Sequence, residues 1–254
     1  MLALNENATS AAAHLGTARE HAPRPVPSHT MAHAARHDIL RRLAPALRHD
    51  MVVNLQSVGM MAEALSARLE RGNADTDEMQ AAMSKLNRLT RRAVEACVEV
   101  ATWMDPAEND ATPLNAGIEE TARLLRSGLN FRGFTLTHVP SEDDFLVARC
   151  ALRFLLPAAI LMLCDSAPEP GELTITADTS ATHAVLAITF SLVAKDPDEI
   201  DPLLPDTGER PLFWPDVRAL AECESVEIRR HEGQVILRFP RTVATSPLKL
   251  VPVI

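Results

Sequence analysis

Apolar residues recur at alternating steps of four and three from about residue 37 to residue 70, the repeat of a helix with one apolar seam. Gly72 marks a stop, and Asp75 or Thr76 is a candidate N-cap for a second helix that ends at Asp105, just before Pro106. The seam residues are Leu47, Met51, Asn54, Val58, Met61 and Leu65 in the first predicted helix, and Met79, Met83, Leu86, Thr90, Ala93, Cys97, Val100 and Met104 in the second.

Two long helices joined by a short loop predict an antiparallel hairpin. A single hairpin leaves part of each seam in water, and the usual solution is to pair two hairpins in a four-helix bundle. We therefore expect a homodimer.

The pattern changes after a linker of sequence PAENDATP, residues 106–113. Alternation predicts strands and a 3.6-residue repeat predicts helices, in the order helix, strand, helix, two strands, loop, helix, hairpin. The predicted helices are 115–129, 148–167 (where Pro157 suggests a kink or an early break) and 213–222; the predicted strands are 133–139, 171–178, 183–192, 225–230 and 234–240; the loop is 194–211.

This order predicts an α+β protein: a long antiparallel helical hairpin forming a dimeric four-helix bundle, followed by an α/β sandwich with helices on one face of a mixed sheet. The expected divisions are a disordered tail at 1–35, the hairpin domain at 36–106, the second domain at 113–241 and a C-terminal tail at 242–254.

Composition narrows the function. The net charge of −9 argues against a general nucleic-acid binder, because phosphate backbones recruit basic surfaces. Four cysteines without CxxC spacing favour buried free thiols over a zinc site or disulfides. No apolar run approaches the roughly 20 residues of a membrane span, and no secretory signal is evident. We expect a soluble, cytoplasmic protein without a metal site.

The candidate chemistry lies at His49 and Asp50. If Leu47 and Met51 are seam positions, His49 falls at heptad position f and faces solvent, with Asp50 on the flank and Arg48 beside them. An exposed neutral imidazole is a usable nucleophile near pH 7, and an adjacent carboxylate can orient it or take its proton. A surface histidine on a charged helix face is the plainer interpretation, and the dipeptide alone does not decide between the two.

A His-Asp pair on the first helix of a hairpin resembles the dimerisation and histidine-phosphotransfer domain of sensor histidine kinases. The likeness extends over residues 37–241. The stretch LCDSAPEPGELTITAD is similar to the family's asparagine-bearing helix and next strand, and WPDVRALAECESVEIRRHEGQVILRFP to its closing helix and hairpin.

Three departures from the family concern its ATP site. Residues 149–165 contain no asparagine to hold magnesium, SLVAKDPDEID has no glycine where the family has Asp-x-Gly-x-Gly, and TGERPLFWPDV has one glycine and carries Phe213 and Trp214 near the expected Gly-rich lid. The resemblance thus implies a degenerate ATPase domain with no nucleotide cofactor, as in ChpT-like histidine phosphotransferases.

By this resemblance, His49 accepts a phosphoryl group from a receiver-domain aspartate and passes it to a response regulator. Asp50 assists as acid or base, Arg48 contacts the acidic pocket of the receiver, and the receiver brings Mg²⁺. Many members carry Thr or Asn four residues after the histidine, where this sequence has Val53. Asn54 is the next residue and a further candidate contact, although its seam position also suits fixing helix register. Two alternatives stay open: a non-enzymatic dimeric adaptor that regulates a response regulator or kinase, and a divergent ATP-dependent histidine kinase.

Overall fold

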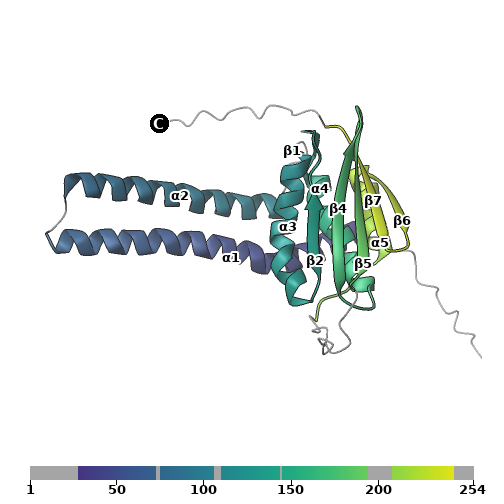
Figure 1. The fold of residues 1–254 in the computed structure, drawn as a ribbon, viewed down its shortest axis with the longest axis horizontal. Coiled ribbons are helices and arrows are strands. Elements are labelled where there is room, and N and C mark those ends of the chain that lie inside the picture. Colours follow the sequence, from purple (N-terminus) through teal and green to yellow (C-terminus); the bar gives the residue numbers. More distant parts are fainter. Residues whose placement is uncertain (1–27, 73–74, 106–109, 144, 194–207, 243–254) are drawn as a thin grey trace, which may run out of the picture.

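The computed structural model describes residues 28–72, 75–105, 110–143, 145–193 and 208–242 (Figure 1). Helices α1 (Ser28–Glu70) and α2 (Thr76–Met104) run antiparallel as a long hairpin, and Asp75 caps α2 by accepting from the backbone N–H of Asp77. The predicted hairpin is confirmed.

The α/β part follows the predicted order of elements and adds two short strands that the sequence pattern did not indicate. Its helices are α3 (Leu114–Phe131), α4 (Arg149–Ser166) and α5 (Trp214–Glu224); its strands are β1 (Ala111–Pro113), β2 (Thr135–Val139), β3 (Leu146–Ala148), β4 (Gly171–Thr179), β5 (His183–Leu192), β6 (Glu227–His231) and β7 (Gln234–Pro240). Strands β1 and β3 pair only with each other within the described residues, and they are too short to show an alternating pattern.

Five strands form a mixed sheet in the order β2-β4-β5-β7-β6. The β2–β4 pair is parallel and the other pairs are antiparallel. Alternate residues of the central strands are buried, for example Leu173 and Ile175 of β4 and Leu186 and Ile188 of β5, so one face of the sheet forms the core with the helices. The α+β class, with a helical hairpin followed by an α/β sandwich, is therefore confirmed, while the dimeric bundle stays a prediction.

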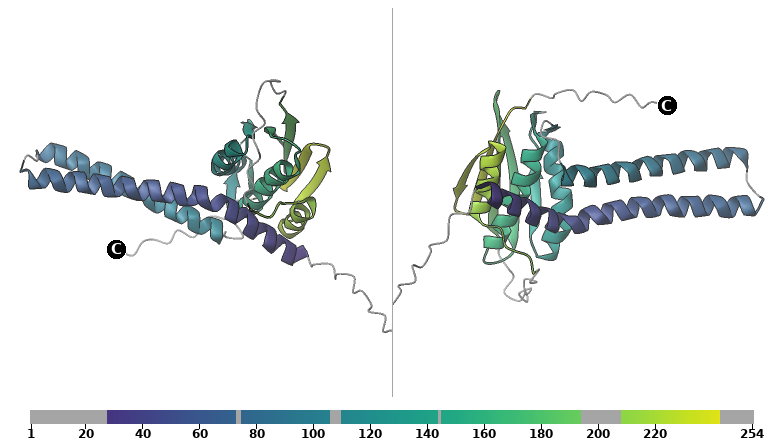
Figure 2. Two further views of the ribbon diagram at one scale, coloured as in Figure 1. Left: turned by 90° about the horizontal axis from the view of Figure 1, so that it is seen from below. Right: turned by 180° about the vertical axis from the view of Figure 1, so that it is seen from behind.

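The first helix belongs to both parts of the molecule. Its first half packs against the helix layer, mainly against α5, and its second half leaves with α2 as the projecting hairpin (Figure 2). The buried residues of this first half are Ala32, Ala35, Ile39, Leu43 and Leu47.

The prediction of a tail ending at residue 35 is therefore wrong for residues 28–35, which are helical. Ala32 and Ala35 are small enough to let α1 approach the α/β surface closely, and alanines spaced in this way do not stand out in an alanine-rich stretch. Residues 1–27, the linker residues 106–109, the loop residues 194–207 and the tail residues 243–254 lie outside the described residues.

The two seams of the hairpin differ from each other. All six predicted seam residues of α1 are buried or half-buried. In α2, Met79, Leu86, Ala93 and Val100 are covered, but Met83, Thr90, Cys97 and Met104 are exposed. One neighbouring helix covers only one side of the α2 seam, and the other side is open.

Both internal prolines leave their helices continuous. Pro157 lies within α4, which does not break there, and Pro45 lies within α1. All four cysteines are free; Cys164 is buried and Cys150 and Cys223 are half-buried, but Cys97 is exposed, so the expectation of buried thiols is wrong for that residue. Among the described helices, none is long and apolar enough to cross a membrane.

Candidate functional site

His49 lies on α1 two residues after Leu47, the last residue that packs into the α/β core. Its side chain is 75% exposed, and its Nδ1 lies 3.6 Å from Oδ1 of Asp50. The imidazole therefore faces solvent, as its heptad position predicts, with a carboxylate beside one ring nitrogen.

The carboxylate of Asp50 is bound by a residue that lies outside the hairpin, Arg123. Its Oδ2 accepts a hydrogen bond from Nη1 of Arg123 on α3, and Nη2 of the same guanidinium donates to Oε1 of Glu99 on α2 at 2.7 Å. Arg123 thus ties α1, α2 and α3 together beside His49.

The other two predicted site residues lie differently. Arg48 is exposed, and its guanidinium makes no ion pair among the described residues, so it is free to meet a partner. Asn54 is half-buried, and its Nδ2 donates to the backbone carbonyl of Asp50 at 2.8 Å. The Asn54 amide is therefore engaged with the helix backbone one turn below His49.

A cavity of about 600 Å³ opens beside His49, between α1 and α3. Its walls are mostly apolar, and charged side chains stand at both ends: Asp50 and Arg123 near the histidine, and Arg42, Arg132 and Glu209 at the far end. The apolar lining residues are Pro45, Ala46, Leu124, Leu125, Leu129, Phe131 and Leu161. Any molecule that reaches His49 from this side also meets the α/β domain.

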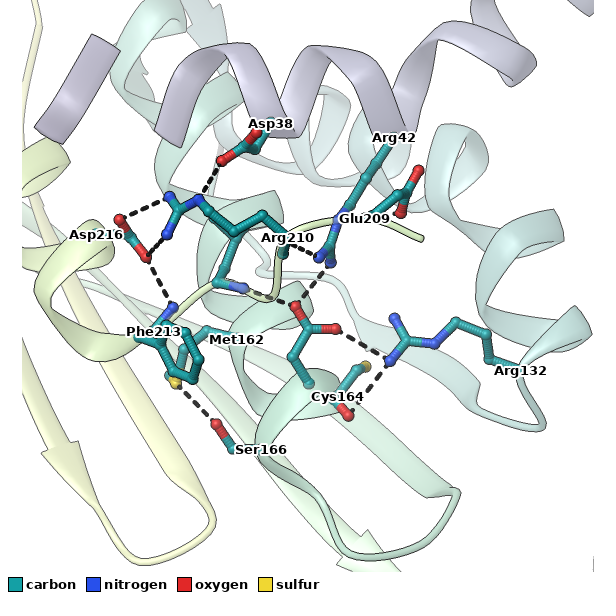
Figure 3. Close-up of polar contacts among 12 residues, drawn as sticks. Asp38, Arg42, Arg132, Met162, Cys164, Ser166, Glu209, Arg210, Phe213 and Asp216 are labelled. Atoms are coloured by element: carbon teal, nitrogen blue, oxygen red, sulfur yellow. Dashed lines mark hydrogen bonds and ion pairs between the residues drawn. The ribbon is translucent and has the colours of Figure 1, made fainter. Parts of the chain in front are cut away.

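Arg42 and Arg132, which line this cavity, both bind one buried carboxylate (Figure 3). Asp165, near the C-terminal end of α4, is only 6% exposed and accepts three hydrogen bonds. These come from Arg42 of α1 at 2.8 Å, Arg132 at 3.0 Å and the backbone N–H of Leu212 at 2.9 Å. A buried carboxylate requires such partners, and here they draw α1, α3 and α4 together.

The segment before α5 is fastened by a second group of contacts in the same view (Figure 3). Arg210 donates from Nε to Asp38 of α1 at 2.7 Å and from Nη2 to Asp216 at 2.9 Å, and hydrogen bonds to these carboxylates raise its pKa. Arg42 also donates to the backbone carbonyl of Arg210 at 2.6 Å. The segment before α5 is thus bound to α1 through Arg210 and Glu209.

A third link joins α1 to α5. Arg36 forms an ion pair with Glu224, and the thiol of Cys150 donates to the same carboxylate at 3.4 Å. Burial, and then the charge of Glu224, raise the pKa of Cys150 to about 12. Cys150 is therefore a neutral thiol at physiological pH and not a nucleophile.

The tripeptide Arg-His-Asp occurs twice on α1, at residues 36–38 and 48–50. In the first copy, His37 is 76% exposed and its Nδ1 lies 3.7 Å from Oδ1 of Asp38, whose Oδ2 binds Arg210. This matches His49, Asp50 and Arg123, but His37 does not line the cavity. The repeat is visible in the sequence, and sequence analysis missed it.

Arg123, Arg132 and Asp165 were also missed. They lie far from His49 along the chain and in segments with no motif, so only the fold brings them to the site. No group of three or more histidine, cysteine or acidic residues that could hold a metal occurs within the described part of the chain.

Comparison with known proteins gives likeness to solved structures alone. No family model matches the sequence, and no curated protein matches it. The catalytic domain of histidine kinase ThkA is 17% identical, with 54% of this chain and 96% of that chain covered and a TM-score of 0.39. A bacterial phosphotransferase is 17% identical over 80% of this chain and 95% of its own, with a TM-score of 0.33.

The third similar structure is ThkA in complex with the response regulator TrrA. It is 16% identical, with 88% of this chain and 70% of that chain covered and a TM-score of 0.39. At such identities and TM-scores, these likenesses assign neither an activity nor a partner to this chain.

Proposed function

We propose that this chain is a histidine phosphotransferase of a two-component phosphorelay, and that it works without binding ATP. The observation that carries the proposal is the exposed imidazole of His49, with the Asp50 carboxylate beside Nδ1 and the cavity opening next to it. The partners are receiver domains of response regulators.

In the proposed reaction, the lone pair of His49 Nε2 attacks the phosphorus of an aspartyl phosphate on the donor receiver. A bond from nitrogen to phosphorus forms, the bond from phosphorus to the aspartate oxygen breaks, and the carboxylate leaves with its electron pair. The proton of the imidazole stays on Nδ1, facing Asp50, which also stabilises the positive charge that develops on the ring. The reverse sequence passes the phosphoryl group to the acceptor receiver.

The charged residues near His49 suit such a partner. Arg48 is exposed and unpaired among the described residues, so it can meet the acidic pocket of a receiver. Asn54 would contact the phosphoryl group only after giving up its hydrogen bond to the Asp50 carbonyl. The chain supplies no cofactor of its own in this proposal, and Mg²⁺ comes with the receiver.

The absence of an ATP-dependent step is inferred from the three missing nucleotide elements. The contacts of residues 209–212 support the inference. Glu209 and Arg210 form ion pairs with Arg42 and Asp38 of α1, and a segment held in this way is not free to close over a nucleotide.

The proposed working form is a homodimer. Apolar side chains are exposed along both helices of the hairpin, which is the surface that a second hairpin would cover. They are Val52, Val53, Leu55, Met60 and Leu69 on α1 and Met83, Val94, Val98 and Met104 on α2.

The deciding experiment mixes the protein with a panel of receiver domains labelled with ³²P on aspartate, without ATP. Acid-labile, base-stable label on the wild-type chain is expected, and His49→Gln should abolish it. The matched control is His37→Gln, which removes an equally exposed histidine from the same tripeptide on the same helix and should leave labelling intact.

Other outcomes of this experiment would contradict the proposal. Receiver binding without label on the wild type would make the chain an adaptor. Label lost in His37→Gln but kept in His49→Gln would move the phosphoacceptor to the first copy of the repeat. In a separate incubation without receivers, label obtained from γ-labelled ATP and Mg²⁺ would make it a kinase.

A further inference from the structure

Arg123 is the described residue through which the α/β domain touches the His49–Asp50 pair with a charge. It lies on α3, 73 positions after Asp50, and is only partly exposed. Its two terminal nitrogens bind two carboxylates of the hairpin, Asp50 on α1 and Glu99 on α2. A guanidinium suits this task because its nitrogens are fixed in one plane.

This bridge divides the two oxygens of Asp50 between two partners. Oδ2 accepts a hydrogen bond from Arg123, and Oδ1 faces Nδ1 of His49 at a distance of 3.6 Å. That separation is an ion-pair distance slightly longer than a hydrogen bond. A carboxylate facing Nδ1 favours the tautomer with the proton on Nδ1, so the lone pair resides on Nε2.

We propose that Arg123 is a positioning residue for His49: it fixes the Asp50 carboxylate so that Nδ1 keeps the proton and Nε2 is presented as the nucleophile. The orientation is a property of the folded chain, whereas its effect on phosphoryl transfer rests on the proposed function above. In consequence, the chemistry of His49 depends on how the α/β domain is seated on the hairpin.

The charged groups around the pair come from every element packed against it. They are Arg42 and Arg48 on α1, Glu99 on α2, Arg123 on α3, Arg132 directly after α3, and Glu209 before α5. Arg42 and Arg132 are engaged with Asp165, and Glu209 pairs with Arg42. Arg123 is therefore the cation positioned to orient Asp50.

The first copy of the repeat provides an internal reference. Asp38 has the same division of oxygens, Oδ2 to Arg210 and Oδ1 toward His37, but its arginine comes from another segment. A change at Arg123 should therefore alter His49 and leave His37 unchanged.

The first test is ¹⁵N NMR of the histidine rings of the full chain near pH 8, where neutral imidazole predominates. In the wild type, His49 should be mainly the Nδ1–H tautomer. Arg123→Ala should shift His49 toward Nε2–H and leave the His37 signals in place. The matched control is Arg126→Ala, because Arg126 lies one turn further along α3, is as exposed, and pairs only with Glu119 at 3.7 Å among the described residues.

The second test is the rate of transfer from a ³²P-labelled receiver. Arg123→Ala should lower the maximal rate by about tenfold, which is less than the roughly 100-fold that loss of a positioned acid–base group costs, with little change in receiver affinity. Arg123→Lys should recover part of the rate, because lysine keeps the charge but does not hold both carboxylates in a fixed plane.

The two tests fail in different ways. If the His49 tautomer and the transfer rate of Arg123→Ala match those of Arg126→Ala, Arg123 does not position His49. If the wild type accepts no phosphoryl group from any receiver, the proposed function is wrong, and the NMR measurement still decides the orientation of Asp50. If Arg123→Ala loses its helical circular dichroism, Arg123→Met decides, because it removes the charge and keeps most of the side-chain volume; an unchanged His49 tautomer in that variant would overturn the proposal.

Discussion

The two halves of α1 are built for different surroundings. In residues 28–47, one row of side chains at steps of three or four is buried, because the α/β domain covers it. This row consists of Ala32, Ala35, Ile39, Leu43 and Leu47. In residues 51–70, Leu65 is the one fully buried residue, and Val52, Val53, Leu55, Met60 and Leu69 are exposed. Residues 28–47 thus form an anchor in the α/β core, and residues 51–70 form one side of the two-helix hairpin.

His49 lies between these two halves of α1. It lies immediately after the anchor, so its backbone is fixed by the α/β domain while its ring faces solvent. A partner that docks along the exposed half of the hairpin would reach His49 at the point where the rigid half begins. Substitutions that affect one half alone can test the division.

The largest difference is expected from matched leucine truncations. Leu43→Ala removes a fully buried side chain from the anchor and should lower the free energy of unfolding by about 3 kcal/mol, within the usual range of ~2–5. Leu69→Ala, the same change at an exposed position of the other half, should cost less than about 0.5 kcal/mol. Urea denaturation followed by circular dichroism measures both. Equal losses would contradict the division of α1 into two halves.

A somewhat smaller effect is expected from Asp165→Asn. The change leaves Glu209 as the charged partner of the buried Arg42 guanidinium and weakens the pairing of Arg132, so we expect a loss of about 2 kcal/mol in unfolding free energy. Glu119→Gln is the control, because its exposed ion pair with Arg126 should contribute less than about 0.5 kcal/mol. If the two variants are equally stable, the buried contacts do not fasten the anchor.

The smallest expected effect is on self-association. Val98→Lys puts a charge on the exposed apolar surface of α2 and should weaken the dimer at least tenfold, which corresponds to about 1.4 kcal/mol. Val139→Lys, at the end of β2, should leave association unchanged. Sedimentation velocity over a concentration series measures both, and a wild type that stays monomeric at high concentration would disprove the predicted dimer.

Sequence patterns were sufficient for most of the fold. The elements with a sustained repeat, such as the two long helices and strands β4, β5 and β7, were predicted because their apolar spacing is unambiguous. Strands β1 and β3 were missed because three residues carry no period, and residues 28–35 were assigned to a tail because alanine is as common in tails as in tight helix contacts.

The site was predictable only in part. The exposure of His49 follows from its heptad position, because local periodicity fixes which way a helical side chain points. The partners of Asp50 and Asp165 do not follow, because Arg123 and Arg42 reach them through the tertiary packing of α1 on α3 and α4. Whether the exposed seam residues of α2 are covered also depends on a second hairpin, which a single chain does not reveal.

Pro45 lies within the anchored half of α1, between the buried Leu43 and Leu47 and four residues before His49. It has no amide hydrogen, so the carbonyl of Arg41 lacks its usual helical donor, and a helix bends most readily at such a point. A bend at Pro45 would turn the rest of the helix through one angle. The far end of the hairpin would therefore move much further than His49, which is about one helical turn from the proline.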